Sequence, residues 1–267
     1  MIRTVVTGVA GRMGSSIVRF VRDADDMKLV GASERPGSAH IGLDVGLACR
    51  LGTMEIPIVD NLTEAIGTGA DVVIDFSSAD ASALHSRICA EKKIPYVVGT
   101  TGFTAKTRAD VTTAATAIPI LMAPNMSVGV TLMLRLAAQA AKVLGDAYDV
   151  EIVELHHRMK KDAPSGTALR LGEIAAEATK RDPAVHLRLT RSGAIGERAK
   201  KEIGIQALRG GDAVGEHTIF FIGDGERLEI THRATSRDQF ALGALRAARF
   251  LVGKPAGLYD MFAVLGM

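Results

Sequence analysis

The chain has 267 residues, of which 47% are hydrophobic and 23% charged, and it contains no tryptophan. These proportions are typical of a globular protein, and the length is sufficient for one large domain or two of ordinary size. Lys and Arg number 32 and Asp and Glu 30, so the formal net charge is +2. A protein that coats nucleic acid or an anionic membrane carries a larger positive excess, so we expect neither as a partner.

Several features of the sequence favour a cytoplasmic protein. The uncharged stretch 111–134 is long enough to span a bilayer. Pro119 and Pro124 would break its hydrogen bonds in lipid, so we expect a helix end, a buried strand, a loop and a buried helix there instead. The N-terminus lacks the basic and apolar regions of a secretory signal. Cys49 and Cys89 lie in no CxxC or His-rich pattern, so neither a disulfide framework nor a metal site is expected.

Short runs rich in Val and Ile alternate with helical stretches in the first half of the chain, a pattern typical of βαβ units around a parallel sheet. We expect strands at 4–7, 28–33, 72–76, 96–98 and 118–122, and helices at 11–22, 81–92 and 104–115. The later elements expected are helices at 128–144, 167–180 and 240–252, and strands at 150–155 and near 186–190, 202–208, 217–222 and 227–232. The fold class is therefore α/β, with a Rossmann-type doubly wound parallel sheet and a second, α+β domain built on a mixed sheet. We expect the helix at 240–252 to end the chain.

The first expected strand leads into Gly8-Val9-Ala10-Gly11-Arg12-Met13-Gly14, which opens a helix. A strand, a glycine turn, a helix, a second strand and an acidic residue are the parts of a dinucleotide site. Glycines permit a tight turn, and the N-terminus of a helix attracts a pyrophosphate. The spacing is GxxGxxG rather than GxGxxG, and an alternative is that the glycines serve only the packing of the helix on the strand.

The end of the second expected strand bears on the choice of cofactor. Glu34 is placed to accept hydrogen bonds from an adenosine ribose, which favours NADH. Arg35 follows directly, and its guanidinium could hold the extra phosphate of NADPH. The sequence is therefore compatible with either cofactor.

Two later loops follow strands that should end at the same edge of the sheet, where ligands bind in such folds. They are Gly99-Thr100-Thr101-Gly102 and Ala123-Pro124-Asn125-Met126. The alternative is ordinary turn chemistry, with Thr101 or Ser127 as a helix cap.

The segment 154–168 has the densest chemistry of the chain. It contains His156-His157-Arg158-Met159-Lys160-Lys161, and Ser165-Gly166-Thr167 then precedes a helix. Cations beside a helix N-terminus predict an anion site and an acidic substrate. A histidine, with a pKa near ~6.5, and a lysine crowded by other cations are both suited to proton transfer. The alternative is a solvated basic loop paired with Asp162. Metal binding is not expected, because adjacent histidines on a strand point to opposite faces and no third ligand lies nearby.

These motifs together resemble the dihydrodipicolinate reductase family, the 4-hydroxy-tetrahydrodipicolinate reductases of the bacterial diaminopimelate and lysine pathway. The resemblance spans the chain and depends on 8–14, 99–103, 123–129 and above all 154–168. Met159 departs from the pattern, because relatives often carry histidine there. That difference removes one possible titrating group.

The resemblance implies roles for individual residues. His156 and Lys160 would handle protons, and His157, Gly166 and Thr167 would hold a cyclic dicarboxylate substrate. NADH or NADPH would contact Gly8, Val9, Ala10, Gly11, Arg12, Met13, Glu34, Arg35, Gly99, Thr100, Thr101, Ala123, Pro124, Asn125 and Met126.

It also implies the organisation of the chain. Residues 1–126 would form the dinucleotide-binding domain, 127–236 a domain for substrate binding and oligomerisation, and 237–267 a segment that returns to the first domain. The family is usually a homotetramer, with the sheets of the second domain forming much of the interface.

A mechanism follows, in which the nicotinamide delivers hydride to a carbon conjugated with the ring C=N and a side chain supplies the proton. Our hypothesis is that Lys160 is the main donor and that His156 shapes its pKa and the path to solvent. Two alternatives remain: another two-domain NAD(P)-dependent amino-acid dehydrogenase, or a non-catalytic dinucleotide-sensing protein. Both alternatives would keep the glycine loop, so it is the segment 154–168 that distinguishes a reductase of this family from them.

Overall fold

A seven-stranded parallel sheet organises the first of two structural units in the computed structural model, which describes residues 1–267. This unit comprises Met1–Ser127 and Asp238–Met267, and the second comprises Val128–Arg237. The strand order in the first sheet is β12-β6-β5-β4-β1-β2-β3. The strands are β1 (Ile2–Thr7), β2 (Met27–Ser33), β3 (Ile58–Val59), β4 (Val72–Asp75), β5 (Tyr96–Val98), β6 (Pro119–Met122) and β12 (Gly257–Tyr259).

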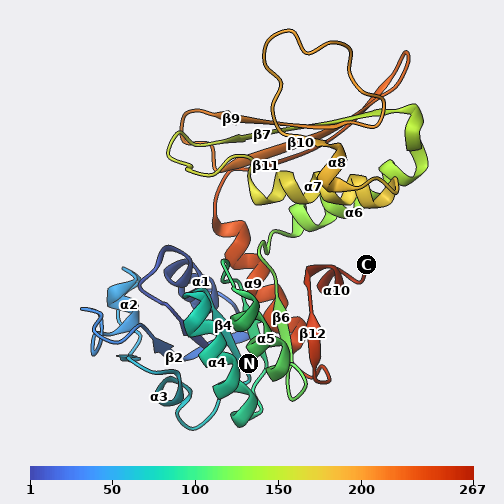
Figure 1. Cartoon of the computed structure of the whole chain (residues 1–267). Helices are drawn as coiled ribbons and strands as arrows, with labels where there is room; N and C mark the ends of the chain where they lie inside the picture. Colours follow the sequence, from blue (N-terminus) through green and yellow to red (C-terminus); the bar gives the residue numbers. More distant parts are fainter. The chain divides into compact units, whose positions relative to one another are not determined.

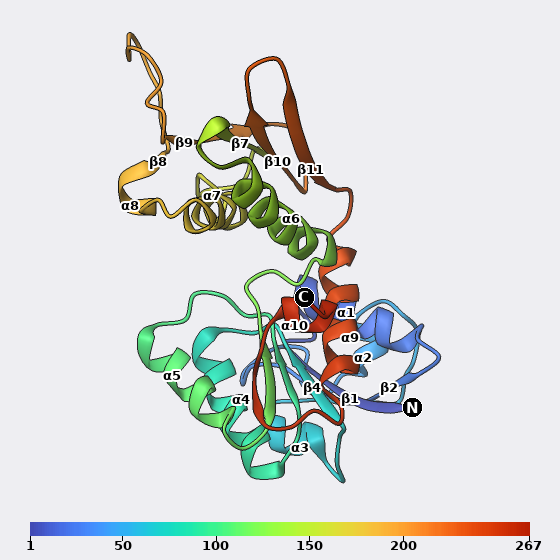
Figure 2. The same ribbon diagram turned by 90° about the vertical axis from the view of Figure 1, so that its right-hand side faces the viewer.

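Helices cover both faces of this sheet (Figures 1 and 2). They are α1 (Arg12–Arg22), α2 (Val45–Ala48), α3 (Leu62–Ile66), α4 (Ala79–Lys92), α5 (Ala105–Ala114), α9 (Asp238–Leu251) and α10 (Met261–Leu265). Helices α3, α4 and α5 share one core with alternate residues of the strands, and α1 packs beside α9. Because both faces are covered, all four residues of β4 are buried, including Asp75.

The second unit has a five-stranded mixed sheet in the order β11-β10-β7-β9-β8. Its strands are β7 (Asp149–His156), β8 (Leu187–Arg188), β9 (Ile203–Arg209), β10 (Gly215–Ile222) and β11 (Arg227–Ala234), and its helices are α6 (Val128–Leu144), the 3-10 turn η1 (Gly145–Ala147), α7 (Gly166–Ala178) and α8 (Pro183–His186). Strand β10 runs antiparallel to β7 and β11, whereas β9 is parallel to β7. Helices α6 and α7 lie side by side on one face and bury Ile152, Ile205 and Phe221 (Figure 1).

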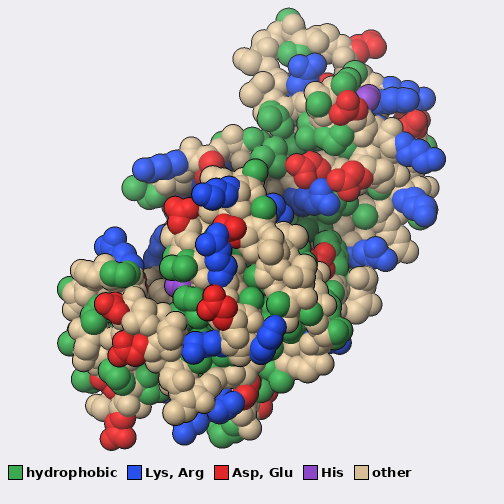
Figure 3. All heavy atoms as spheres, turned by 60° about the horizontal axis from the view of Figure 1, so that its bottom comes forward, with side chains coloured by type: hydrophobic (Ala, Val, Ile, Leu, Met, Phe, Trp, Pro, Cys, Tyr) green, Lys and Arg blue, Asp and Glu red, His purple; other side chains and the backbone are tan.

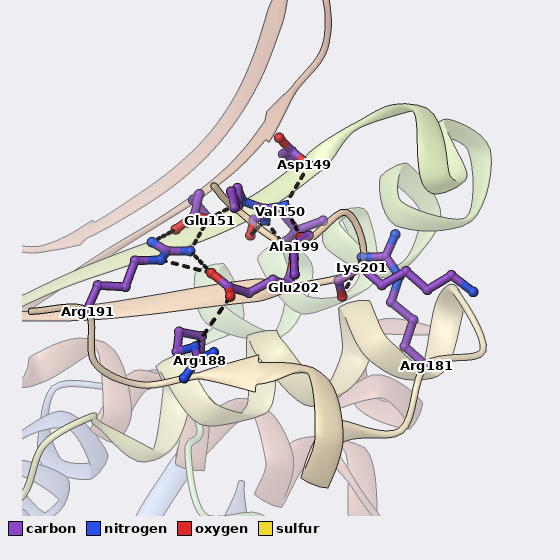
Figure 4. A network of polar contacts seen from close by, with 10 residues as sticks. Asp149, Val150, Glu151, Arg181, Arg188, Arg191, Ala199, Lys201 and Glu202 are labelled. Carbon is purple, nitrogen blue, oxygen red and sulfur yellow. Dashed lines mark hydrogen bonds and ion pairs between the residues drawn. The ribbon is translucent and has the colours of Figure 1, made fainter. Parts of the chain in front are cut away.

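The opposite face of this sheet holds a network of ion pairs, shown in Figure 4. Glu151 of β7 accepts two hydrogen bonds from Arg191, at 2.8 and 2.7 Å, and one from Arg198, at 2.9 Å. Both arginines belong to the segment that joins β8 to β9. The network therefore pins a segment without regular structure to a strand of the sheet.

The predicted fold class is confirmed, and the errors concern short elements. The expectation that the helix at 240–252 ends the chain is wrong, because β12 and α10 follow it and β12 pairs with β6. The elements α2, β3 and α3 were not expected, since runs of two to five residues show no periodicity. The strand expected near 186–190 shrinks to Leu187–Arg188, because Asp182 caps the short helix α8 directly before it.

The uncharged stretch resolves as expected into the end of α5, β6, a loop and α6. Helix α6 with η1, Val128–Ala147, is the one helix long and apolar enough to cross a membrane, with a mean hydropathy of 1.3. That is weak evidence, because core helices of soluble proteins meet the same criterion. Met133, Ala137 and Ala141 recur on one face of α6 and are buried in the core shared with α7.

Candidate active site

The glycine loop after β1 is shaped for close backbone approach. Gly8 has φ +68°, in the left-handed region that favours glycine. A Cβ on Gly14 would lie 2.1 Å from the carbonyl oxygen of Gly8, so any larger residue would push α1 off the loop. Both glycines are thus required by the geometry of the turn, whether or not a ligand binds.

The start of α1 differs from the other α-helix starts at which a capping residue is identified. Gly11 is the N-cap of this 11-residue helix and provides no side-chain hydrogen bond. Side chains cap the other helices for which a capping residue is identified: Asp44 (α2), Asn61 (α3), Ser78 (α4), Thr104 (α5), Ser165 (α7), Asp182 (α8) and Asp260 (α10). The first N–H groups of α1 are therefore not satisfied by a cap, and Ala10, Gly11 and Arg12 beside them are exposed. This arrangement fits a pyrophosphate, which would receive hydrogen bonds and the positive end of the helix dipole.

Glu34 lies directly beside the glycine loop. One of its carboxylate oxygens accepts a hydrogen bond from the N–H of Ala10 at 3.0 Å, and the other accepts one from the N–H of Arg35 at 3.0 Å. Glu34 is half-buried and Arg35 is exposed. The carboxylate of Glu34 and the backbone of Arg35 therefore lie next to each other beside the loop, which agrees with sites for a ribose and for an additional phosphate without choosing between them.

The loops after β5 and β6 lie at the same edge of the sheet as the glycine loop, because all the strands are parallel. Thr100 is buried and accepts a hydrogen bond from Ser82 at 2.8 Å. Asn125 accepts one from the N–H of Ser127 at 2.9 Å. Both loops are therefore held by their own polar side chains. Thr101 and Pro124 are exposed and Gly99 is half-buried.

Some predicted cofactor residues at this edge are buried. Val9, Ala123 and Met126 are buried, with exposed fractions of 0%, 5% and 1%, and Met13 is half-buried. The side chains of these three buried residues are therefore not exposed at this edge.

One loop at this edge was missed by the sequence interpretation. Phe76 and Ser77 follow β4, and their backbone lies 3.4 to 3.5 Å from the place where a Cβ on Gly8 would be. The N–H of Ser77 donates to the buried carboxylate of Asp75 at 2.8 Å. This loop lies where the strand order reverses between β1 and β4, the point at which ligands bind in such sheets. This loop could have been predicted from the sequence, because it directly follows the strand expected at 72–76.

In the second unit, the end of β7 holds a fully buried carboxylate. Glu154 has an exposed fraction of 0% and lies on the same face of the strand as His156, since they are two residues apart. Its oxygens receive hydrogen bonds from His156 Nδ1 at 2.5 Å, from both terminal nitrogens of Arg209 at 2.8 Å and from the N–H of Ser165 at 3.0 Å. Burial raises the pKa of Glu154, but these donors outweigh it and hold the pKa below its ordinary value. The carboxylate is therefore ionised.

His156 and His217 lie against each other with ring centroids 5.2 Å apart. Burial lowers the pKa of His156, and its hydrogen bond to Glu154 offsets part of this effect. Burial, together with the nearby His156, lowers the pKa of His217 to about 4. His217 is therefore neutral at pH 7, and its Nε2 lies 2.9 Å from the hydroxyl of Ser165.

The segment after β7 presents Lys160 and the N-terminus of α7. Lys160 Nζ donates to both carboxylate oxygens of Asp162 at 2.9 Å. Ser165 caps α7 by accepting from the N–H of Ala168 at 3.2 Å. Gly166 is exposed, and a Cβ there would meet no atom within 4 Å. An anion therefore has open access to the first turn of α7.

His157 is anchored separately from His156. Its N–H donates to the carbonyl of Ala213 at 2.8 Å, and its Nε2 lies 3.4 Å from Arg237. The structure thus brings together His156, His157, Lys160, Gly166 and Thr167 within one unit, while the predicted cofactor residues all lie in the other. Sequence interpretation missed Arg209 and His217, which no local spacing connects to β7.

Comparison with known proteins assigns the family. Residues 2–126 match the family model described as dihydrodipicolinate reductase, N-terminus, and residues 129–265 match dihydrodipicolinate reductase, C-terminus. The 4-hydroxy-tetrahydrodipicolinate reductase of Anaeromyxobacter sp. (strain Fw109-5) is 59% identical, with 100% of this chain and 98% of that protein covered. That of Myxococcus xanthus (strain DK1622) is 56% identical with the same coverage.

Solved structures agree with this assignment. The dipicolinate-bound dihydrodipicolinate reductase from Paenisporosarcina sp. TG-14 superposes with a TM-score of 0.78 at 28% identity, covering 98% of each chain. An amine dehydrogenase from Mycobacterium smegmatis, at 15% identity and a TM-score of 0.60, shares the fold alone. The chain therefore belongs to the dihydrodipicolinate reductase family, as its motifs predicted.

Proposed function

We propose that the protein is an NAD(P)H-dependent reductase that converts 4-hydroxy-tetrahydrodipicolinate to tetrahydrodipicolinate in the diaminopimelate route of lysine biosynthesis. The observation that supports this most directly is the grouping of His156 and Lys160 with the open first turn of α7 at Gly166. Full-length relatives at 56% to 59% identity carry this reductase name. The amino-acid dehydrogenase and sensor alternatives give no account of that grouping.

The substrate would dock through its carboxylates. The N–H groups at Gly166 and Thr167 begin a 13-residue helix, whose dipole favours an anion at this end. Lys160 and His157 would hold the substrate from the preceding segment. In the relative from Paenisporosarcina the bound molecule is dipicolinate, a ring with two carboxylates, which supports a cyclic dicarboxylate as the ligand.

The side chains of this segment would also supply the proton. When bound, the dinucleotide supplies a hydride to a ring carbon conjugated with the C=N bond. The electron pair displaced onto nitrogen or the adjacent carbon then takes a proton. The 4-hydroxyl would leave as water before the hydride is transferred. We propose Lys160 as the immediate donor, because its Nζ is held by hydrogen bonds to Asp162, and His156 as the group that regulates it.

The first unit would hold the cofactor. The uncapped start of α1 would bind the pyrophosphate, Glu34 the ribose of NADH, and Arg35 the additional phosphate of NADPH. The loops 99–101 and 123–126 would complete the site. We therefore propose use of both cofactors.

The assembly proposed is a cytoplasmic homotetramer joined through the sheet of the second unit. The face of that sheet away from α6 and α7 presents Leu208 and Ile222, with exposed fractions of 51% and 39%. No nucleic acid or membrane is proposed as a partner. On the face drawn in Figure 3, Lys and Arg are interspersed with Asp and Glu, and no patch of one sign dominates.

Turnover of single variants tests the function. NADH and NADPH oxidation would be followed by absorbance, with substrate generated enzymatically, for the wild type, Lys160→Ala and His156→Ala. Loss of a positioned proton donor lowers kcat by roughly 10²- to 10⁴-fold. Lys161→Ala is the matched control, since Lys161 is an exposed neighbour of Lys160. Near-normal kcat in both variants would refute the roles, and no oxidation of either cofactor by the wild type would refute the function.

A further inference from the structure

Glu154 is an ionised carboxylate in a place where the sheet otherwise buries apolar side chains. Val150 and Ile152 lie on the same face of β7 and have exposed fractions of 1% and 0%. Burying a charge costs several kcal/mol unless partners compensate it, so an aliphatic residue at 154 would be the simpler choice for stability. The carboxylate has instead four donors aimed at its two oxygens. A buried charge with so complete a set of partners suggests a use beyond packing.

Arg209 connects this carboxylate to the segment that contains Lys160. Its two terminal nitrogens each donate to Glu154 at 2.8 Å, and one of them also donates to the carbonyl oxygen of Asp162 at 2.8 Å. Asp162 is the residue whose side chain holds Lys160. One guanidinium therefore binds the end of β7 and the loop that positions the lysine.

The residues after Arg209 reinforce this connection through the backbone. The N–H of Gly210 donates to the carbonyl of His156 at 3.0 Å, and the N–H of Arg158 donates to the carbonyl of Gly211 at 3.2 Å. Gly215, farther along, has no Cβ, and one there would lie 2.9 Å from His156 Nε2. The end of β9, the loop after it and the first residue of β10 thus surround His156.

We propose that Glu154 and Arg209 are positioning residues for the reduction, because their buried ion pair fixes the His156 ring, the Lys160 segment and the first turn of α7 as one unit. The inference rests on the proposed function for its effects on kcat and KM, but not for its effect on the titration of His156. Nothing about Glu154 or Arg209 requires that they touch the substrate.

Glu154 sets the tautomer of His156. Glu154 accepts the proton on Nδ1, which leaves Nε2 as the nitrogen that takes up and releases a proton. The groups that face this ring are Glu154 from β7, Lys160 from the following loop, Arg209 from β9 and His217 from β10. Glu154 alone among them favours the imidazolium, so it opposes the lowering of the His156 pKa by burial and by the nearby cations.

Glu154→Gln tests the inference, because glutamine keeps the shape and removes the charge. We expect the pKa of His156, measured by NMR of its ring carbon, to fall by about one unit or more. The acidic limb of the kcat profile should move to lower pH by the same amount, while the Kd for NADPH stays unchanged. An unaltered His156 titration would overturn the inference. It would do so even if the wild type proved inactive, so failure of the proposed function is distinguishable.

Arg209→Lys provides a second, independent test that does not depend on Glu154→Gln folding. Lysine keeps the positive charge near His156 but cannot bind Glu154 and the Asp162 carbonyl together. We expect an unchanged His156 titration and a rise of about tenfold in KM for the substrate, as expected for loss of one charge-assisted hydrogen bond. Unchanged KM in this variant would contradict the role of Arg209.

Glu151→Gln is the matched control. Glu151 is on the same strand and is paired to Arg191 through two hydrogen bonds, but it lies on the opposite face of the sheet (Figure 4). Removing its charge should leave both the His156 titration and the KM as in the wild type. If Glu151→Gln shifted the His156 pKa as much as Glu154→Gln, the effect would come from general disturbance of β7 and the inference would fail.

Discussion

His217 gives the protein a pH-dependent stability whose sign and size follow from its burial. Its exposed fraction is 4%, and its pKa falls from 6.5 to about 4 in the folded chain. Between these values the unfolded chain binds a proton that the folded chain does not, so stability rises with pH. The contribution is complete above the unfolded pKa of 6.5 and is lost as the pH falls toward 4.

The size of the effect can be worked from the shift. One pKa unit corresponds to ~1.36 kcal/mol, so lowering the pH from ~7 to ~5 should cost about 2 kcal/mol through His217. His156, whose pKa is also lowered by burial, adds a loss of the same sign. Carboxylates with lowered pKa values, such as Glu154, lose their contribution only at lower pH. Between pH 7 and 5, the change in the free energy of unfolding therefore comes mainly from the histidines.

His217→Gln is the perturbation that tests this reasoning. The glutamine amide can hydrogen-bond to a hydroxyl, as His217 Nε2 does to that of Ser165, but it does not titrate. Urea unfolding would be followed by far-UV circular dichroism at pH 7 and 5, at one protein concentration because assembly alters apparent stability. We expect the loss between these pH values to be about 2 kcal/mol smaller in the variant than in the wild type.

Two results would refute this account. The first is an equal loss of stability in the variant and the wild type between pH 7 and 5. The second is titration of His217 near 6.5 in the NMR spectrum of the folded protein. A built-in control is the range from pH 7 to 8.5, in which His217 is neutral in both states, so both proteins should change in parallel.

Two further predictions concern the first unit. Gly14→Ala places a Cβ 2.1 Å from the Gly8 oxygen and must move α1 or the loop, so the Kd values for NADH and NADPH, measured by fluorescence titration, should both rise by about tenfold or more; unchanged affinity would contradict the proposed pyrophosphate site. Arg35→Ala should raise the Kd for NADPH by about tenfold through loss of a charge-assisted phosphate contact and leave NADH unaffected. Equal effects on the two cofactors would remove Arg35 from the proposed 2′-phosphate site.

The glycine loop could be predicted from sequence because its physics is local. A buried strand, Gly8, Gly14 and a helix follow one another within a few residues, and each restricts the next through φ values and close packing. The same holds for the capped start of α7, where Ser165 and Ala168 are three residues apart. Such patterns need no knowledge of which strands are neighbours.

The partners of His156 could not be predicted in this way. Glu154 was visible in the segment 154–168, but its burial depends on the sheet that forms around it. Arg209 reaches it only because β9 pairs in parallel with β7, in a register that places Ala207 opposite Glu154 and Arg209 opposite His156. His217 lies opposite Glu154 on the other side, through β10. A register across 50 or more residues leaves no trace in local periodicity.

The anchoring of the two adjacent histidines explains how a strongly cationic segment keeps a defined geometry. Alternation along β7 predicted that His156 and His157 point to opposite sides, and each has its own support: Glu154 for His156, and Ala213 with Arg237 for His157. Without the buried carboxylate, Arg209 and His156 would lose their shared partner, and a protonated His156 would be repelled by Arg209 and Lys160. Glu154 holds Arg209 and His156, and Asp162 holds Lys160, while the first turn of α7 stays open at Gly166. The remaining positive charge is thereby available to an external dicarboxylate, although the net charge of the whole chain is only +2.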